Sequence, residues 1–301
     1  MKIGLIGLGK MGHNLALNLR DHGQEVIGFD LSEESRRALV REGVKVVASL
    51  KEQVEQLDAP RVIWMMVPSG KATEETIASA LALLGKDDIL IDAGNSNYKD
   101  SMRRAAECAE KGIRFLDVGT SGGMSGARNG ACLMIGGSKE AFDLLEPVFM
   151  SISCKDGCAY VGEAGAGHFM KMVHNGVEYG MMEAIGEGFS VMRSAPFEYD
   201  LATVAKNWNH GSVVRSWLME LAEEQLEAHP DLADIKGIVA ASGEAKWTIE
   251  AALEQEVPVP VIAQALFERN ASQAGEENFS NKVVSALRNG FGGHDIVSEG
   301  R

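Results

Sequence analysis

KIGLIGLGKMG, residues 2–12, joins an apolar run to a turn with regularly spaced glycines. The apolar run predicts a buried strand, and the residues after the turn predict a helix. In such a strand–turn–helix unit, Gly7 permits a tight turn, and Gly9 lets the backbone approach a pyrophosphate. Gly12 allows close contact between helix and strand, while the helix N-terminus faces the phosphates. The stretch predicts a dinucleotide-binding fold rather than a glycine turn without a ligand.

A carboxylate ends the second predicted strand, EVIGFD. Asp30 follows Gly12 by 18 residues, which suits a side chain that bonds the ribose 2′-hydroxyl of a dinucleotide. Its charge would repel the 2′-phosphate of NADP, so we expect NAD as the cofactor and weaker use of NADP. Arg36 and Arg37 could soften this preference, although both also suit a solvated helix surface. The predicted cofactor-binding residues are Gly7, Leu8, Gly9, Lys10, Met11, Gly12, Asp30, Val67 and Asn95.

Short apolar runs alternate with amphipathic segments in the first half of the chain. Nearly continuous apolar strands between helices indicate a parallel sheet that is covered on both faces. Ser49 and Glu52 form a capping-box pattern at the start of one helix. We predict strands at residues 2–7, 25–30, 44–49, 61–67, 88–93, 113–118, 131–137 and 158–162, and helices at 10–22, 33–42, 50–57, 71–84, 98–111 and from Ser138.

The strand-like runs stop midway along the chain, and long helical patterns follow. Pro230, Pro258 and Pro260 fall between these patterns, where proline is tolerated. We therefore predict an α/β Rossmann-like domain at residues 1–165 and an all-helical domain for substrate binding and oligomerisation at 166–301. The helices of this second domain are predicted at residues 165–194, 200–209, 213–228, 244–256, 260–270 and 276–289.

Acidic residues outnumber basic ones 43 to 29 in the 301-residue chain, which gives a formal net charge of −14. This balance argues against nucleic acid or an anionic membrane surface as a partner, because both select clustered lysine and arginine. An anionic small molecule remains compatible, since a pocket can be locally positive. The sequence shows no secretory signal and no apolar stretch of membrane-spanning length, so we expect a cytoplasmic protein.

The four cysteines, Cys108, Cys132, Cys154 and Cys158, are irregularly spaced. Cys154 and Cys158 could suggest a metal or redox pair, but no set of histidine and cysteine ligands accompanies them at finger-like spacing. We therefore expect reduced thiols and no bound metal ion.

KMVHNGVEYG, residues 171–180, places many polar groups on one side of a predicted helix. A solvated surface is one interpretation, because a lysine and a glutamate often pair on exposed helices. A catalytic surface is the other, because oxidation of an alcohol by hydride transfer needs a base, and an uncharged lysine can be that base. At about 3.6 residues per turn, the side chains that share less than half of the circumference are Lys171, His174, Asn175, Glu178 and Tyr179.

Residues 119–130, GTSGGMSGARNG, form a segment of small residues rich in glycine. In an open parallel sheet, the segments at the carboxyl ends of the strands form the ligand crevice. The N–H groups of Ser121, Gly122 and Gly123 could hold a carboxylate there, although a flexible linker would have a similar composition. Asn95, in DAGNSNY after another predicted strand, would point into the same crevice.

GLGKMG, GTSGG and a lysine four residues before an asparagine on the first long helix together resemble the β-hydroxyacid dehydrogenase superfamily. Within it, AGHFMKMVHNGVEYG is similar to the decarboxylating 6-phosphogluconate dehydrogenases of the pentose phosphate pathway. IDAGNSNY, the KWT of residues 246–248, ALFERN and the GFGGH of residues 290–294 extend the resemblance over nearly the whole chain. The chain resembles the short form of this family, and Asp30 stands where NADP-dependent members carry an Asn-Arg-Thr-like sequence.

The resemblance implies oxidation and decarboxylation of 6-phosphogluconate to ribulose 5-phosphate, with reduction of NAD. Lys171 would accept the hydroxyl proton and, once protonated, would stabilise the carbonyl oxygen. Glu178 would protonate the carbon of the enediol, while His174 and Asn175 would position the sugar hydroxyls. Hydroxyls and cationic groups, the arginines in particular, would bind the phosphate. The implied substrate-binding residues are Asn95, Ser121, Gly122, Gly123, His174, Asn175, Tyr179, Lys246, Thr248, Arg269, Arg288 and His294.

The resemblance also implies a homo-oligomer, because in the family a glycine-rich tail after the last helix completes the site of a neighbouring subunit. Arg288 and His294 flank that tail. Two alternatives stay open. Another β-hydroxyacid dehydrogenase, acting on 3-hydroxyisobutyrate or a short aldonate, would need Lys171 but little of the phosphate-binding set. A non-catalytic dinucleotide sensor would need the glycine turn and Asp30, without a lysine and a glutamate sharing one helix face.

Overall fold

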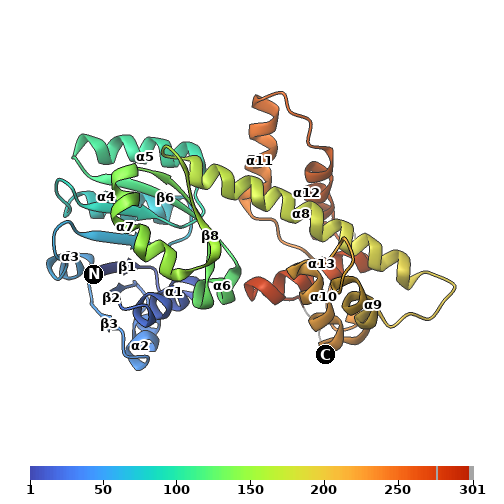
Figure 1. Cartoon of the computed structure of the whole chain (residues 1–301). Helices are drawn as coiled ribbons and strands as arrows, with labels where there is room; N and C mark the ends of the chain where they lie inside the picture. The colour runs from blue at the N-terminus through green and yellow to red at the C-terminus, as the bar shows by residue number, and fades with distance from the viewer. Residues whose placement is uncertain (276, 298–301) are drawn as a thin grey trace. The chain divides into compact units, whose positions relative to one another are not determined.

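The computed structural model describes residues 1–275 and 277–297, and the chain folds into two compact units, Met1–Met172 and Val173–Arg301 (Figure 1). The division falls inside one long helix, α8 (Ala166–Arg193), a few residues beyond the domain limit that we proposed at residue 165. The predicted end of the second domain and the predicted helix start at residue 276 lie outside the described residues.

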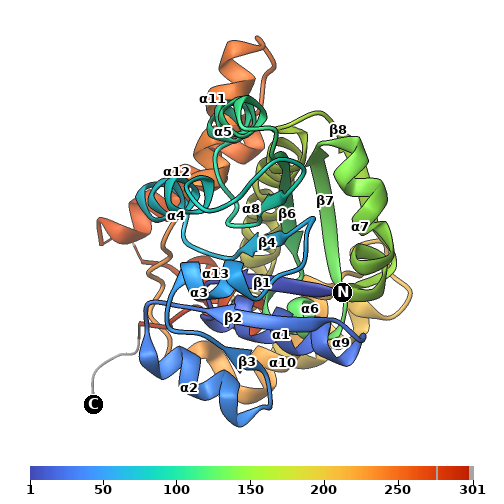
Figure 2. The same cartoon turned by 90° about the vertical axis from the view of Figure 1, so that its left-hand side faces the viewer.

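The N-terminal unit contains an eight-stranded sheet with the order β3-β2-β1-β4-β5-β6-β7-β8 (Figure 2). The first six of these strands are parallel, which confirms the α/β Rossmann-like fold. The strands are β1 (Lys2–Ile6), β2 (Glu25–Phe29), β3 (Lys45–Val46), β4 (Val62–Met65), β5 (Ile89–Asp92), β6 (Arg114–Ser121), β7 (Ala131–Gly137) and β8 (Ser153–Gly162).

The sheet is not parallel throughout, because β7 runs antiparallel to β6 and β8 then runs parallel to β7. Only residues 122–130 connect β6 to β7. A parallel crossover needs a dozen residues or more, so this connection has to reverse the chain. It contains a short helix, α6 (Gly123–Asn129), where the sequence predicted only a glycine-rich segment.

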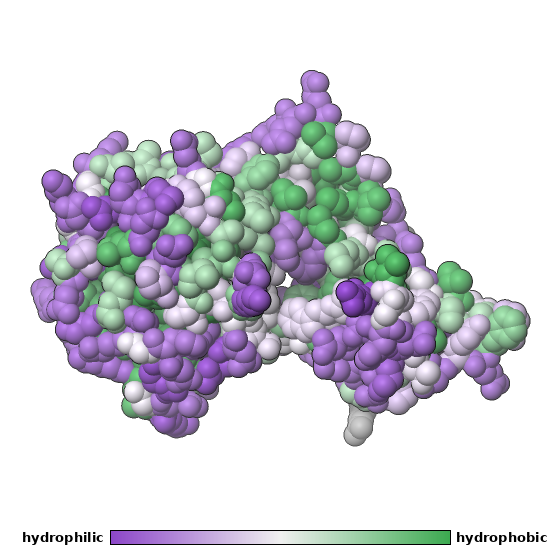
Figure 3. All heavy atoms as spheres, in the orientation of Figure 1, coloured by the Kyte–Doolittle hydropathy of each residue, from purple (hydrophilic) through white to green (hydrophobic). Residues whose placement is uncertain are grey.

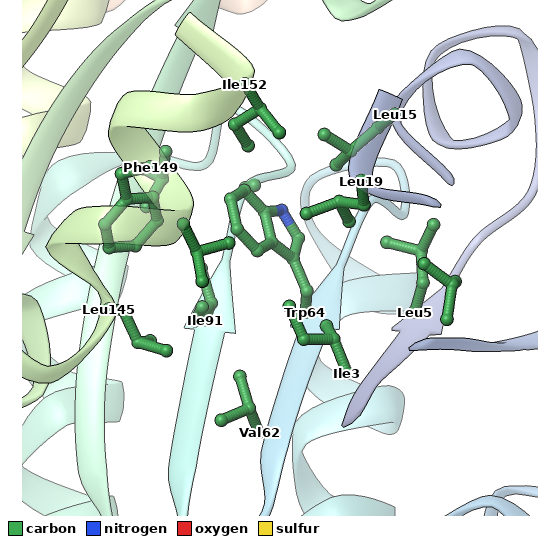
Figure 4. Close-up of a cluster of buried hydrophobic side chains, with 14 of the residues drawn as sticks. Ile3, Leu5, Leu15, Leu19, Val62, Trp64, Ile91, Leu145, Phe149 and Ile152 are labelled. Carbon is green, nitrogen blue, oxygen red and sulfur yellow. The ribbon is translucent and has the colours of Figure 1, made fainter. Parts of the chain in front are cut away.

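Helices cover both faces of the sheet, as the continuous apolar strands predicted. In β4, Val62 and Trp64 face one hydrophobic cluster, while Ile63 and Met65 face the other. Figure 4 shows the Trp64 ring between the strands and the helices of the first cluster. The helices α1 (Lys10–Asp21) and α7 (Lys139–Ile152) belong to the first cluster, and α3 (Leu50–Glu55), α4 (Lys71–Leu81) and α5 (Tyr98–Glu110) to the second.

Side-chain caps fix the starts of several helices in this unit. The Ser49 hydroxyl accepts the N–H of Glu52 at 3.1 Å, as the capping-box pattern predicted. The Glu52 carboxylate, however, accepts the N–H of Ala48 rather than that of Ser49. Ser32 caps α2 (Glu33–Arg41), and Ser138 caps α7, by accepting the N–H groups of the residues three positions along.

The described residues of the C-terminal unit form helices joined by loops and no β-strand, as predicted. Phe189, Met182 and Leu221 lie in its hydrophobic core. The predicted glycine-rich tail after the last helix was wrong in part, because the helix continues to Gly292 and Gly293 ends it with a φ of 58°. After α8, the helices are α9 (Leu201–Asn209), α10 (Trp217–Ala228), α11 (Gly243–Glu254), α12 (Pro260–Gln273) and α13 (Phe279–Gly292), with a 3₁₀ turn at Pro230–Leu232.

Across the described residues, no helix combines the length and the apolar character needed to cross a membrane. Residues 1–275 and 277–297 also contain no cluster of three or more histidine, cysteine, aspartate or glutamate side chains arranged for a metal ion. The four cysteines are free thiols, and burial raises the pKa of Cys108 to about 12.

Candidate active site

A cleft of about 790 Å³ opens at the carboxyl ends of the parallel strands, within the N-terminal unit. It lies where the strand order changes direction between β1 and β4, which is the usual ligand position in an open α/β sheet. All of the predicted cofactor residues except Leu8 line it. The Leu8 side chain is instead buried in the core. The lining comprises Gly7, Gly9, Lys10, Met11, Gly12, Asp30, Val67 and Asn95, together with residues of α4 and its approach.

The three glycines of the first turn each meet a different steric requirement. Gly7 has a φ of 87°, and a Cβ there would lie 2.5 Å from the Met66 carbonyl oxygen. A Cβ at Gly12 would lie 1.8 Å from the Gly7 carbonyl oxygen, so the helix rests directly on the turn. A Cβ at Gly9 would meet no protein atom within 4 Å. Gly9 therefore keeps the cleft side of the turn open, which fits a pyrophosphate at the start of α1.

Asp30 is fixed by the backbone around it. Its carboxylate accepts the N–H of Leu8 at 2.6 Å and the N–H of Ser32 at 2.7 Å. Arg36 donates to the carbonyl oxygens of Asp30 and Leu31. Arg37 pairs with Glu33 on the exposed side of α2. Both arginines thus have partners within this segment, and a carboxylate remains on the cleft wall where a ribose hydroxyl would bind.

Asn95 lies in a strained turn after β5, with a φ of 53°. Its side-chain oxygen accepts the N–H of Thr120 at 3.5 Å, and both residues line the cleft. Below the turn, the buried Asp92 carboxylate accepts from the Ser96 hydroxyl at 2.8 Å and from Arg104 at 2.9 Å. Sequence reasoning found Asn95 but missed this ion pair, because Arg104 reads as one more charge on an amphipathic helix.

Lys171 lies in the first turns of α8, and only 5% of it is exposed. Its side-chain stem passes directly over β6, since a Cβ at Gly119 would lie 2.4 Å from the Lys171 Cβ. Ser121 ends the same strand, and Gly122, with a φ of 116°, follows it before α6. The predicted base therefore contacts the strand that leads into the predicted carboxylate-binding segment. Gly123 is the first residue of α6.

Two polar side chains of α8 are as deeply buried as core residues, unlike the polar side chains of an ordinary surface helix. Lys171 is 5% exposed and Tyr179 is 3% exposed, whereas Val177 is 50% exposed. His174 Nδ1 lies 3.0 Å from the side-chain oxygen of Asn175 and 3.8 Å from the Glu178 carboxylate. The solvated-surface interpretation is therefore wrong for Lys171 and Tyr179.

A cationic cluster lies within the helical unit. The Arg269 guanidinium sits 3.2 Å from the centre of the Tyr179 ring, and only 2% of Arg269 is exposed. Burial lowers the pKa of Arg269 to about 10 and also lowers the pKa of Arg288. Among the described residues, no carboxylate forms an ion pair with either arginine, and Arg269 Nε has no hydrogen-bond partner. A buried cation that forms no ion pair is suited to an anionic ligand.

The remaining predicted substrate residues differ in their surroundings. Thr248 is buried on α11, where its methyl group would lie 3.0 Å from a Cβ at Gly176. The Lys246 side chain is exposed and lies 3.6 Å from Glu250. The His294 ring packs edge-on against Phe291 at 6.0 Å. The predicted substrate residues of this unit therefore do not share one environment. Thr248 is buried, whereas the Lys246 side chain is exposed.

Ser242 is a residue of the helical unit that sequence reasoning missed. Its hydroxyl lies 3.0 Å from the Tyr179 hydroxyl, and its N–H donates to the same oxygen at 2.9 Å. This pairing holds the phenol beside Arg269. A serine in a loop carries no periodic signal, so only its position as a helix-start residue before α11 could have drawn attention to it.

Both halves of the chain match known domain families. The NAD binding domain of 6-phosphogluconate dehydrogenase matches residues 2–162, and the 6-phosphogluconate dehydrogenase C-terminal domain matches residues 167–295. The two matches follow each other in the order that the fold shows, with a sheet domain before a helical one.

Full-length relatives agree with these matches. The putative 6-phosphogluconate dehydrogenase YqeC of Bacillus subtilis strain 168 is 49% identical over 98% of both chains. The NAD(+)-dependent, decarboxylating 6-phosphogluconate dehydrogenase of Haloferax volcanii is 44% identical over 99% of both. The structure of Plasmodium falciparum 6-phosphogluconate dehydrogenase superposes with a TM-score of 0.83 at 31% identity, over 95% of this chain and 70% of that one. The chain therefore belongs to the 6-phosphogluconate dehydrogenase family.

Proposed function

We propose that this protein oxidises 6-phosphogluconate and releases carbon dioxide to give ribulose 5-phosphate, with NAD as the hydride acceptor. The proposal depends mainly on Arg269, a buried guanidinium that forms no ion pair with a carboxylate among the described residues, and on the half-buried Arg288. A substrate with a phosphate group supplies the missing negative charge. A short hydroxyacid without phosphate would leave Arg269 buried and uncompensated.

The glycine turn and Asp30 would hold NAD in the cleft, where it would supply the hydride acceptor for oxidation of the substrate alcohol. Lys171 takes the hydroxyl proton as the general base, a step that starts from the uncharged amine. The protonated amine then stabilises the carbonyl oxygen of the β-keto acid, which eases loss of carbon dioxide. Glu178, two turns further along α8, donates a proton to the carbon of the enediol. His174 and Asn175 orient the sugar hydroxyls.

The carboxylate end of the substrate is assigned to the segment after β6, and the phosphate end to the helical unit. Ser121, Gly122 and Gly123 offer N–H groups to the carboxylate, with Asn95 beside them. The phosphate is assigned to the cationic and hydroxyl-bearing groups Tyr179, Lys246, Thr248, Arg269, Arg288 and His294.

We also propose that the protein works as a homo-oligomer. Figure 3 shows apolar side chains gathered over α8, α11 and α12 of the helical unit. Scattered apolar side chains are normal on a monomer, but a continuous apolar area usually marks an interface. Arg288 interacts electrostatically with Tyr179 and Glu178 of its own chain, so we assign it to the site of that chain as well as to the family's shared tail. The exposed apolar side chains are Val177, Met181, Leu253, Val261 and Phe267.

The test is an assay of purified protein with 6-phosphogluconate, in which reduced cofactor and carbon dioxide are both measured, with NAD and NADP compared. We expect equal amounts of the two products and a preference for NAD. Lys171→Met should lower kcat by about 10³-fold while the Kd for NAD stays within about twofold of the wild-type value. Turnover of 3-hydroxyisobutyrate but not 6-phosphogluconate would contradict the substrate, and full activity of Lys171→Met would contradict the base.

A further inference from the structure

Asp117 is a buried carboxylate on β6 that no step of the proposed reaction uses. It is 0% exposed. One of its oxygens accepts the N–H of Gly165 at 2.7 Å, and the other accepts the N–H of His168 at 2.8 Å. Both N–H groups belong to the start of α8, where the first turn has no acceptors within the helix. A strand residue far away in sequence therefore caps the helix that carries Lys171.

The same face of β6 also controls the distance between strand and helix. Side chains alternate along a strand, so Asp117 and Gly119 face the same side. A Cβ at Gly119 would lie 2.4 Å from the Lys171 Cβ and 3.0 Å from the Gly167 carbonyl oxygen. Asp117 thus binds the start of α8, and Gly119 contacts the Lys171 side chain one helical turn later.

The neighbouring strand completes the contact. Gly136 of β7 pairs with Asp117, and a Cβ there would lie 2.8 Å from the Asp117 carboxylate. A Cβ at Gly167 would lie 2.4 Å from the Asp117 carbonyl oxygen and 2.6 Å from that of Met134. The α8 backbone therefore rests on the backbones of two strands with no layer of side chains between them. A side chain added at such a contact cannot be accommodated by a change of rotamer, because the neighbouring atoms belong to the backbone.

We propose that Asp117 is a positioning residue for Lys171, acting through the first turn of α8 and the Gly119 gap. This inference rests on the proposed role of Lys171 as the base. The carboxylate fixes the height and rotation of the helix start, and the glycine leaves the lysine stem room to lie along the strand. A displacement of about 1 Å at a reacting group costs on the order of 10²-fold in rate, so loss of either feature should slow the chemical step.

Asp117→Asn is the direct test, and Asp88→Asn is its matched control. Asp88 is also buried, and its carboxylate also accepts two backbone N–H groups, from Gly85 at 2.8 Å and Arg61 at 2.6 Å. We expect both variants to lose thermal stability. Only Asp117→Asn should lower kcat, by about 10- to 100-fold, with the Kd for NAD and the KM for 6-phosphogluconate within about threefold of the wild-type values.

Gly119→Ala reaches the same lysine by another route and does not depend on the folding of Asp117→Asn. Its control is Gly4→Ala on β1, where the new Cβ would lie 2.7 Å from Ile63 Cδ1. We expect Gly119→Ala to lower kcat and to enlarge the deuterium isotope effect on hydride transfer, while Gly4→Ala changes neither. The kcat values of both glycine variants are compared with that of Lys171→Met.

Equal kcat values for Asp117→Asn and Asp88→Asn would overturn the positioning role, and so would wild-type turnover of Gly119→Ala. A loss confined to NAD affinity would overturn it as well. If Lys171→Met itself kept full activity, the proposed base would fail instead, whatever the Asp117 variant did. The two failures therefore give different results.

Discussion

The two units of this protein prepare their binding groups in different ways. The N-terminal cleft presents backbone atoms, glycines and one carboxylate that the backbone holds, Asp30. The helical unit presents buried side chains, with Arg269 under the Tyr179 ring and Ser242 holding the phenol. A backbone site forms whenever the sheet folds, whereas a buried cation costs free energy until an anion arrives.

This difference separates what each unit contributes. A site made from backbone groups depends on the close packing of a few glycines, so its substitutions should act on cofactor affinity. A site made from cations that form no ion pair depends on charge, so its substitutions should act on the choice of substrate. The comparison would fail if a substitution in the N-terminal cleft changed the choice of substrate, or if a substitution in the helical unit changed only the affinity for the cofactor.

Among the variants that compare the two units, Arg269→Met is expected to have the largest effect. Loss of a buried guanidinium that we propose to bind phosphate should lower kcat/KM for 6-phosphogluconate by about 10²- to 10³-fold, a cost of about 3–4 kcal/mol. Activity with gluconate, which has no phosphate, should change by less than about threefold. The control is Arg193→Met, because Arg193 also stacks on an aromatic ring, that of Phe279 at 4.3 Å, but is exposed. Equal losses with both sugar acids would show that Arg269 only supports the fold.

Gly9→Ala should have a smaller effect, confined to the cofactor. The added Cβ meets no protein atom within 4 Å, and the φ of −66° at Gly9 suits alanine. We therefore expect an unchanged melting temperature and a Kd for NAD raised by about tenfold, because the methyl group occupies the approach of the pyrophosphate. Gly188→Ala on α8 is the control, since its Cβ also meets nothing within 4 Å. Unchanged NAD binding by Gly9→Ala would move the cofactor away from this turn.

The sequence predicted the N-terminal unit well because its signals are local. Each of these signals depends on residues that are close together in the sequence. They are the glycine spacing, the apolar strands and the cap at Ser49. The direction of β7 was not predicted, since it follows from the length of residues 122–130 and not from their pattern. The strand range 153–162 was also longer than the predicted 158–162, because polar residues at its start hide the pairing.

The site was harder to predict wherever its contacts join distant parts of the chain. Asp117 caps α8 from 48 residues away along the sequence, and Ser242 reaches Tyr179 across 63. Neither pairing produces a periodic pattern in the amino-acid sequence. The polar groups on one side of α8 drew attention to Lys171 and Glu178, whose roles stay predictions, although a solvated helix can carry as many ionisable groups on one face. The burial of Lys171 and Tyr179 on this helix could be seen only in the folded structure.

The smallest effect is a pH dependence of opposite sign in the two units. Burial raises the pKa of Glu183 in the helical unit, where the Ser280 hydroxyl donates to its carboxylate at 3.2 Å. In the N-terminal unit, burial alone would raise the pKa of Glu74, but hydrogen bonds from Arg104 and Arg103 outweigh it and lower the pKa. A raised carboxyl pKa contributes stability that is complete below the ordinary value of 4.5 and is lost as the pH rises through the folded value.

Glu183→Gln should therefore melt about 1–3 °C above the wild type at pH 8, and the two should converge near pH 4.5. Glu74→Gln should behave in the opposite way, because a lowered pKa stabilises the fold only above the ordinary carboxyl range. It should melt below the wild type at pH 8, and this gap should close as the pH falls. Thermal melts across this pH range measure both variants. If Glu183→Gln were less stable than the wild type at pH 8, the ionised carboxylate would be acting as a counter-ion to Arg269, and the charge of the helical cluster would already be compensated without a phosphate.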